Sequence, residues 1–225
     1  MSFEIGKVLN TEEPFSLDIK SIIASRTYIA SETRMGKSWT ARKIVEEVYG
    51  HIPIIILDPE GEYSSLREKY SVVIIGRDVP LEIETAEFMA EWILNENVSA
   101  IIDTSMVKDD KDYIDRFLNH FFYLETTSRK PYLLIVEEAE DYAAEKGAPG
   151  VFLGITAVLA RKGGKRGIGV IYVGHRPAWI SKGILSQCPN KAIGKIESTD
   201  FKALEDFARI PHEIVEKCAS LAKGE

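Results

Sequence analysis

Cysteine is scarce in this sequence of 225 residues, and its scarcity argues against one class of site. The chain holds only Cys188 and Cys218, which are far apart and lack the spacing of metal-binding clusters. No cluster of cysteine and histidine suggests a metal centre either. We therefore expect two ordinary thiols in a reducing cytosol.

Long apolar runs are also missing. No stretch of about 18 apolar residues occurs, so a membrane-spanning helix is not expected. The N-terminal sequence MSFEIGKVLNTEEPF has neither the basic start nor the apolar core of a signal peptide. These absences predict a cytoplasmic protein with no membrane partner.

Positive charge is in deficit, because the formal net charge is −7. This balance counts mildly against a broad surface for nucleic acid, which is usually basic. A small group of cations confined to one place on the molecule remains compatible with it.

Strand-like and helix-like segments alternate along the chain, without internal repeats or low-complexity linkers. Several of the strand-like segments are nearly continuous runs of Ile, Val and Leu, as in strands that are covered on both faces. We expect an α/β fold with a parallel, doubly wound sheet, whose ligand lies at the carboxyl ends of the strands. The expected strands are 26–31, 53–58, 71–76, 98–104, 132–138, 169–175 and 191–196, and the expected helices lie within 36–50, 84–97, 111–128 and 149–164.

The segment YIASETRMGKSWTARK, residues 28–43, resembles a phosphate-binding loop. Its Gly36-Lys37-Ser38 ending matches G-x-x-x-x-G-K-[ST], but Ser31 stands at the first glycine. A strand precedes the loop and a helix follows it, so backbone N–H groups would face phosphate oxygens. The candidate nucleotide-binding residues are Ser31, Glu32, Thr33, Arg34, Met35, Gly36, Lys37, Ser38 and Trp39.

Each residue type in this loop suits one task. Lys37 is expected to reach the β- and γ-phosphates, and Ser38 to ligate Mg²⁺. Arg34 adds a positive charge beside the phosphates and is a candidate arginine finger within the same chain. A plain surface turn before a helix is the alternative interpretation of the loop alone.

Two carboxylates follow the apolar strand in PYLLIVEEAEDY. Glu137 is expected to hold the Mg²⁺ shell, although aspartate is more usual at this position. Glu138 is expected to polarise the attacking water as general base. A solvated acidic strand end is the alternative, and the upstream loop makes it the weaker one.

Two other strand ends carry polar groups. His175, in GVIYVGHRPAWI, is expected to be a neutral ring that donates a hydrogen bond near the γ-phosphate. Taken alone, a histidine at this position would be interpreted first as a satisfied histidine at a strand end. Asp58 and Glu62 flank a turn in IIILDPEGEY, for which Pro59 and Gly61 are well suited.

These motifs, in this order, resemble those of the HerA/FtsK superfamily of ATP-driven DNA translocases, and of HerA in particular. SETRMGKS resembles its Walker A loop, LDPEGEY its D-x-x-G-E-Y turn, and LLIVEEAEDY its Walker B strand. The segments LARKGGKRGIGVIYVGHRP and ILSQCPNKAIGKI resemble its sensor-strand region and the segment after it. The resemblance extends from about Ile5 to the end of the chain.

The resemblance implies a RecA-like (ASCE) P-loop fold that binds ATP and Mg²⁺. It implies a short N-terminal strand segment, residues 1–25, packed on an ATPase domain of residues 26–225. It also implies a homo-oligomeric ring, usually a hexamer, that acts on double-stranded DNA without sequence specificity. Motors of this type often work with a nuclease.

A neighbouring subunit in such a ring would supply an arginine to the γ-phosphate. Arg161 and Arg166 are equal candidates, with Arg176 behind them. Arg161 could instead cap its own helix. The same cluster, with Lys162 and Lys165, could alternatively contact DNA phosphates.

The sequence departs from the family pattern at four positions. Ser31 and Arg34 replace loop glycines, Glu137 replaces aspartate and His175 replaces glutamine. The leading prediction is an ATP-hydrolysing motor that moves double-stranded DNA. A nucleotide-binding switch that assembles on ATP with little turnover is the alternative, and a protein-handling ATPase, supported only by the net acidity, is a weaker third.

Overall fold

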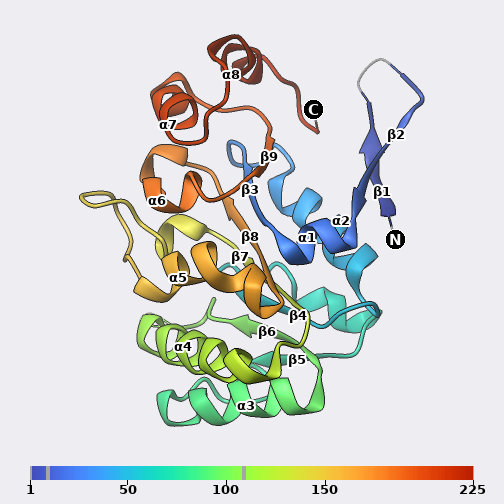
Figure 1. Cartoon of the computed structure of the whole chain (residues 1–225), viewed down its shortest axis with the longest axis vertical. Coiled ribbons are helices and arrows are strands. Elements are labelled where there is room, and N and C mark those ends of the chain that lie inside the picture. The colour runs from blue at the N-terminus through green and yellow to red at the C-terminus, as the bar shows by residue number, and fades with distance from the viewer. Residues whose placement is uncertain (1, 9–10, 108–109, 225) are drawn as a thin grey trace.

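A computed structural model describes residues 2–8, 11–107 and 110–224, and its centre is a seven-stranded parallel sheet (Figure 1). The strand order is β5-β6-β4-β7-β8-β3-β9, and every neighbouring pair is parallel. The strands are β3 (Arg26–Ala30), β4 (Ile54–Asp58), β5 (Val72–Ile75), β6 (Ser99–Asp103), β7 (Tyr132–Val136), β8 (Ile168–Gly174) and β9 (Asn190–Ile193).

The sequence-based prediction of the sheet is confirmed, because all seven expected strands are present. Every predicted C-terminal end except that of β4 was too long; in particular, β7 ends at Val136 and β8 at Gly174. Three candidate residues therefore lie just beyond their strands: Glu137, Glu138 and His175. Side chains there need not alternate between the two faces of the sheet.

Helices cover both faces of this sheet, as expected. They are α1 (Ile19–Ala24), α2 (Lys37–Val48), α3 (Ala86–Glu96), α4 (Lys111–Ser128), α5 (Gly154–Lys162), α6 (Lys182–Leu185), α7 (Phe201–Asp206) and α8 (His212–Ala219). Short 3₁₀ turns join them: η1 (Ser64–Glu68), η2 (Ile83–Thr85), η3 (Ala139–Asp141), η4 (Gly163–Arg166), η5 (Pro177–Trp179) and η6 (Ser198–Asp200).

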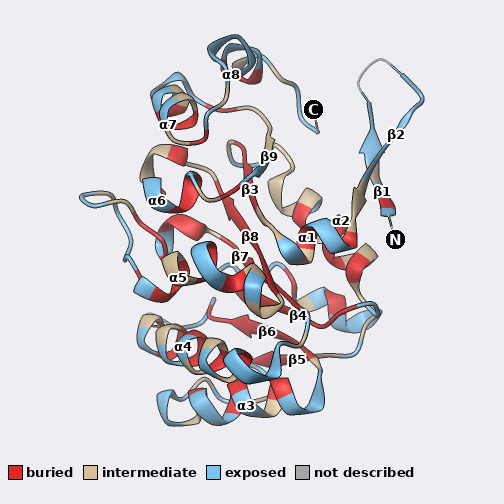
Figure 2. Ribbon diagram, in the orientation of Figure 1, coloured by how far each residue is buried: buried red, intermediate tan, exposed pale blue. Residues whose placement is uncertain are grey.

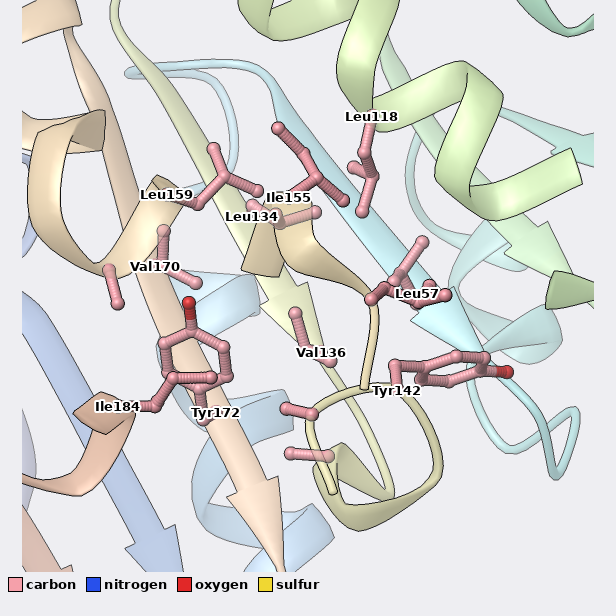
Figure 3. Packing of buried hydrophobic residues seen from close by; sticks show 14 of the residues in the cluster. Leu57, Leu118, Leu134, Val136, Tyr142, Ile155, Leu159, Val170, Tyr172 and Ile184 are labelled. Carbon is pink, nitrogen blue, oxygen red and sulfur yellow. The ribbon is translucent and has the colours of Figure 1, made fainter. Parts of the chain in front are cut away.

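The alternation of side chains along each strand divides the core into two layers. In β4, Ile55 and Leu57 enter the layer beneath α3–α8, whereas Ile54 and Ile56 enter the layer beneath α1 and α2. Figure 3 shows the first layer, in which Leu134 and Val170 of the strands meet side chains of α4, α5 and α6. The central strands are buried along their whole length (Figure 2).

Helix α2 illustrates how the pattern of apolar residues fixes the packing. Its buried residues, Ala41, Ile44, Val45 and Val48, follow the spacing of one helical face, and that face packs on the sheet. The packing fixes the direction of the helix, so its first turn points at the carboxyl ends of the strands.

The N-terminal segment is a β-hairpin followed by a helix. Strands β1 (Ser2–Lys7) and β2 (Pro14–Asp18) pair antiparallel and form a separate two-stranded sheet. Phe3, Ile19 and Ile22 bury their side chains in the layer beneath α1 and α2. The division of the chain at residue 25 stays a prediction.

Candidate nucleotide-binding site

Four adjacent strands, β4, β7, β8 and β3, bring the candidate residues together at one edge of the sheet. Ser31 follows β3, Asp58 ends β4, Glu137 and Glu138 follow β7, and His175 follows β8. All strands of this sheet are parallel, so these chain positions must meet at the same edge.

The phosphate-loop segment begins after β3 and ends where α2 starts at Lys37. Gly36 has φ 109°, a conformation that glycine adopts without strain, and its peptide leads directly into the helix. Ser31 is buried and its φ is not positive, so serine is tolerated at the first glycine position. Arg34 does have a positive φ of 67°, which costs a non-glycine residue about 1 kcal/mol.

A cavity of about 820 Å³ opens above this loop. Its size suits a small-molecule ligand. Six of the nine candidate loop residues line it, whereas Ser31, Glu32 and Met35 do not. The lining residues are Thr33, Arg34, Gly36, Lys37, Ser38, Trp39, Arg42, Glu60, Glu62, Tyr63, Glu138, His175 and Lys223.

Lys37 and Glu138 form the ion pair at the centre of the site. Lys37 Nζ lies 2.7 Å from Glu138 Oε1, although the two residues are 101 positions apart. Burial alone would lower the pKa of Lys37, but the hydrogen bond and charge of Glu138 outweigh it, and the pKa is raised. Lys37 is therefore a cation at neutral pH.

His175 binds the other side of the same carboxylate. Its Nδ1 lies 2.9 Å from Glu138 Oε2 and 2.9 Å from Glu140 Oε1. The hydrogen bond to Glu140 comes first among the causes that raise the pKa of His175 from 6.5 to about 9, and Glu138 adds to it against partial burial. The expected neutral ring is therefore wrong: two carboxylates make His175 an imidazolium at pH 7.

Glu140 supports His175, a role that was not predicted from the sequence. Glu140 Oε1 accepts the backbone N–H groups of His175 and Arg176, at 2.8 and 2.9 Å. Burial would raise the pKa of Glu140, but His175 and these donors lower it. A Cβ at Gly174 would collide with Glu140 Oε2, so any side chain there would displace this carboxylate. The run of acids in EEAED was the available signal.

Glu137 lies beside the cavity and is almost fully buried. Its Oε1 accepts a hydrogen bond from the hydroxyl of Tyr63, which does line the cavity. Burial raises the pKa of Glu137 to about 7, although Tyr63 and Lys37 act in the opposite direction. Tyr63 is the last residue of the LDPEGEY motif, and its contact with Glu137 was not predicted from the sequence.

Asp58 explains the position of Tyr63. Its two carboxylate oxygens accept the backbone N–H groups of Glu62 and Tyr63, at 3.0 and 2.9 Å. Burial raises the pKa of Asp58 to about 6, and these N–H groups oppose the shift. The turn thus fixes the hydroxyl that holds Glu137.

Oxygen donors suited to Mg²⁺ are present in this site. Ser38 lines the cavity with a hydroxyl group, and the carboxylate of Glu137 is buried close enough to Lys37 to feel its charge. Magnesium prefers hydroxyl, carboxylate and phosphate oxygens. Ser38 and Glu137 therefore offer the types of ligand atom that Mg²⁺ binds.

Arg161 and Arg166 are not part of this chain's own site. They lie around η4, at the amino end of β8, whereas the cavity is at the carboxyl ends. Arg161 is exposed, and its Nε donates to Ala157 O of its own helix. Arg166 stacks on Phe122 and donates to Phe122 O and Thr126 Oγ1, so its guanidinium is held against α4.

A known protein family matches the part of the chain that forms most of this site. The model of the family described as "Helicase HerA, central domain" matches residues 3–145, which include the loop, the Asp58 turn and both glutamates. The chain belongs to the HerA central-domain family. The resemblance inferred from the motifs is confirmed.

Curated HerA proteins share only part of their length with the chain. The DNA double-strand break repair helicase HerA of Sulfurisphaera tokodaii is 35% identical over 130 residues, covering 52% of the chain and 26% of the relative. The probable HerA helicase of Methanocaldococcus jannaschii is 30% identical over 162 residues, covering 68% and 32%. The chain thus spans about a quarter to a third of these HerA proteins.

Solved structures confirm the fold. The genome packaging NTPase B204 of Sulfolobus turreted icosahedral virus 2, in complex with ATP-gammaS, aligns with a TM-score of 0.62 at 16% identity, covering 88% of each chain. VirB4 of Thermoanaerobacter pseudethanolicus aligns with a TM-score of 0.69 at 13% identity, covering 99% of this chain and 91% of that one. The HerA-family chain therefore has the predicted RecA-like P-loop architecture. In the described residues, no helix is long and apolar enough to span a bilayer.

The ionised state of His175 predicts a pH dependence of stability. Its folded pKa lies above the ordinary value of 6.5, so its ion pairs stabilise the fold fully below pH 6.5 and lose this effect as the pH approaches 9. We expect His175→Gln to lower the thermal midpoint most at pH 6, with a difference from wild type that shrinks toward pH 9.5. Thermal unfolding of both proteins across this range measures it, and a constant difference would contradict the assignment.

Proposed function

We propose that the chain is an ATP-hydrolysing motor that moves double-stranded DNA as a homo-oligomeric ring. The observation that carries this proposal is the convergence of Lys37, Glu138 and His175 at the phosphate loop. Membership of the HerA family and the fold shared with B204 and VirB4 support it. The number of subunits, a nuclease partner and a cytoplasmic location stay predictions.

In this proposal the chain's own residues divide the chemistry of phosphoryl transfer. Lys37 and the N–H groups at the start of α2 bind the β- and γ-phosphates. Ser38 and Glu137 would hold Mg²⁺, which would neutralise phosphate charge. Glu138 orients the attacking water and accepts its proton.

In this proposal the carboxylate of Glu138 has two roles: it pairs with Lys37 before nucleotide binds, and it activates water afterwards. While Lys37 holds Glu138, the base is not free to face a water molecule. An arriving γ-phosphate offers Lys37 a new anion, which frees Glu138 Oε1 for water while Oε2 keeps its contact with His175. Binding thereby prepares the base for the attacking water.

A ring also requires an arginine from the neighbour, and Arg161 now ranks ahead of Arg166. The guanidinium of Arg166 is held by Phe122 and Thr126 of α4, whereas Arg161 is exposed and only its Nε is bound within its helix. An exposed guanidinium can reach another subunit without breaking contacts of the fold. Lys162 and Lys165 are also exposed and are available to DNA phosphates.

A switch with little turnover is the second candidate function. Two features favour it. Arg34 has a left-handed backbone conformation in the loop, and Glu138 is held by Lys37, so both would have to be accommodated in every cycle of a fast motor. Such a switch would oligomerise on ATP but release negligible phosphate.

One experiment separates these functions: the ATPase rate with and without double-stranded DNA, at two protein concentrations. A motor that shares arginines between subunits should hydrolyse ATP faster with DNA, and its rate per subunit should rise with protein concentration. Folded protein that releases no phosphate at any DNA concentration would exclude the motor. ATP-dependent assembly in that same sample would support the switch.

A further inference from the structure

The C-terminal end of the chain returns to the phosphate loop. Helix α8 is anchored by the buried side chains of Val215 and Cys218, and Leu221 packs against the same core. The chain then leaves α8 as an extended red segment (Figure 1). The N–H of Gly224 donates to the carbonyl oxygen of Met35, at 3.2 Å. We call residues 221–224 the strap.

The strap places a lysine at the cavity. Lys223 lines the same cavity as Lys37, Ser38 and Glu138. The lining holds three other lysine or arginine side chains: Lys37 is engaged by Glu138, Arg42 is engaged by Glu46, and Arg34 belongs to the phosphate loop itself. In the described part of the chain, no carboxylate lies within 4.0 Å of the Lys223 ammonium, and its charge is therefore available to a ligand.

A nucleoside triphosphate is the ligand that suits this arrangement of charges. Its phosphates carry several negative charges, and the cavity wall also holds Glu60, Glu62 and Glu138, which repel them. An additional cation in the lining offsets that repulsion. A lysine on a flexible stem acts as a point charge and tolerates a range of phosphate positions.

We propose that Lys223 is a further nucleotide-binding residue that contacts the phosphate chain, and that the Gly224–Met35 hydrogen bond holds it in place. This inference rests on the proposed ATP site. It makes the strap part of the site, so that the packing of α8 is coupled to the affinity for nucleotide.

Calorimetric binding of ATPγS, ADP and AMP tests the role of the charge. We expect Lys223→Ala to weaken ATPγS binding about tenfold, the effect of one contact of about 1.4 kcal/mol. The loss should be smaller for AMP, Lys223→Arg should restore binding, and Lys223→Glu should weaken it further. Lys217→Ala, an exposed lysine of α8 away from the cavity, is the matched control and should bind as wild type.

A second variant tests the strap and keeps the lysine. Gly224→Pro removes the N–H donor and cannot adopt the φ of 86° found at this position. We expect it to weaken ATPγS binding as much as Lys223→Ala does, while thermal unfolding shows the fold intact.

Two results would overturn the strap inference alone. One is that Lys223→Ala binds ATPγS as wild type does, while Lys37→Ala binds it weakly. The other is tighter binding by Lys223→Ala or Gly224→Pro, which would make the strap an obstacle to nucleotide. Folded wild-type protein that binds no ATPγS would instead remove both the strap inference and the proposed function.

Discussion

Lys37→Ala is expected to abolish ATP hydrolysis, with a loss of at least about 10²-fold, the scale of removing one donor to transition-state charge. Lys37 is the cation whose ammonium lies at the loop, 2.7 Å from the catalytic candidate Glu138. Its removal takes away charge complementary to the phosphates in both the bound state and the transition state. Binding of ATPγS should therefore weaken together with the rate.

The fold itself should tolerate this change. Glu138 keeps its hydrogen bond to the protonated His175, so its carboxylate is not left without a cationic partner. Lys43→Ala is the matched control, because Lys43 lies in the same helix and pairs with Glu47 on the surface. Phosphate release and calorimetric binding measure both variants. Wild-type turnover by Lys37→Ala would show that this loop is not the hydrolytic site.

Glu138→Gln is expected to separate binding from hydrolysis. An amide cannot accept the proton of the attacking water, and loss of a general base costs about 10² to 10⁴ in rate. The same change removes the carboxylate that holds Lys37, so Lys37 is freed for the phosphates. We therefore expect ATPγS to bind as tightly as to wild type, or more tightly, while phosphate release is lost.

Asp141→Asn is the control for this variant. Asp141 is an exposed acid three positions further along, in η3, and does not line the cavity. It should hydrolyse ATP at the wild-type rate. Substantial turnover by Glu138→Gln would place the base elsewhere, and weak binding of ATPγS by it would show that the carboxylate contributes to binding rather than to the chemical step.

The seven strands of the main sheet, helices α2–α5 and the phosphate loop could be predicted from the sequence alone, whereas α1, α6, α7 and α8 were not predicted. The predicted features depend on local patterns: apolar runs such as IIILD and YLLIV form buried strands, and Gly36-Lys37-Ser38 opens a helix after a strand. Parallel strands present their carboxyl ends at one edge, so Lys37 and Glu138 were expected at the same edge, and the strand order β7-β8-β3 then brings Lys37 Nζ to 2.7 Å from Glu138 Oε1.

Only the tertiary structure decided the charge of His175 and the hydrogen bond from the hydroxyl of Tyr63 to Glu137. It also decided that Arg161 is exposed while Arg166 is held against α4, and that Lys223 lies at the phosphate loop. Each depends on side chains that are distant in sequence and on the burial they share. A proton on His175 is stable because Glu138 and Glu140 both face it, and burial sets the pKa of Glu137. Local sequence carries no record of either environment, because solvation and charge are properties of the folded neighbourhood.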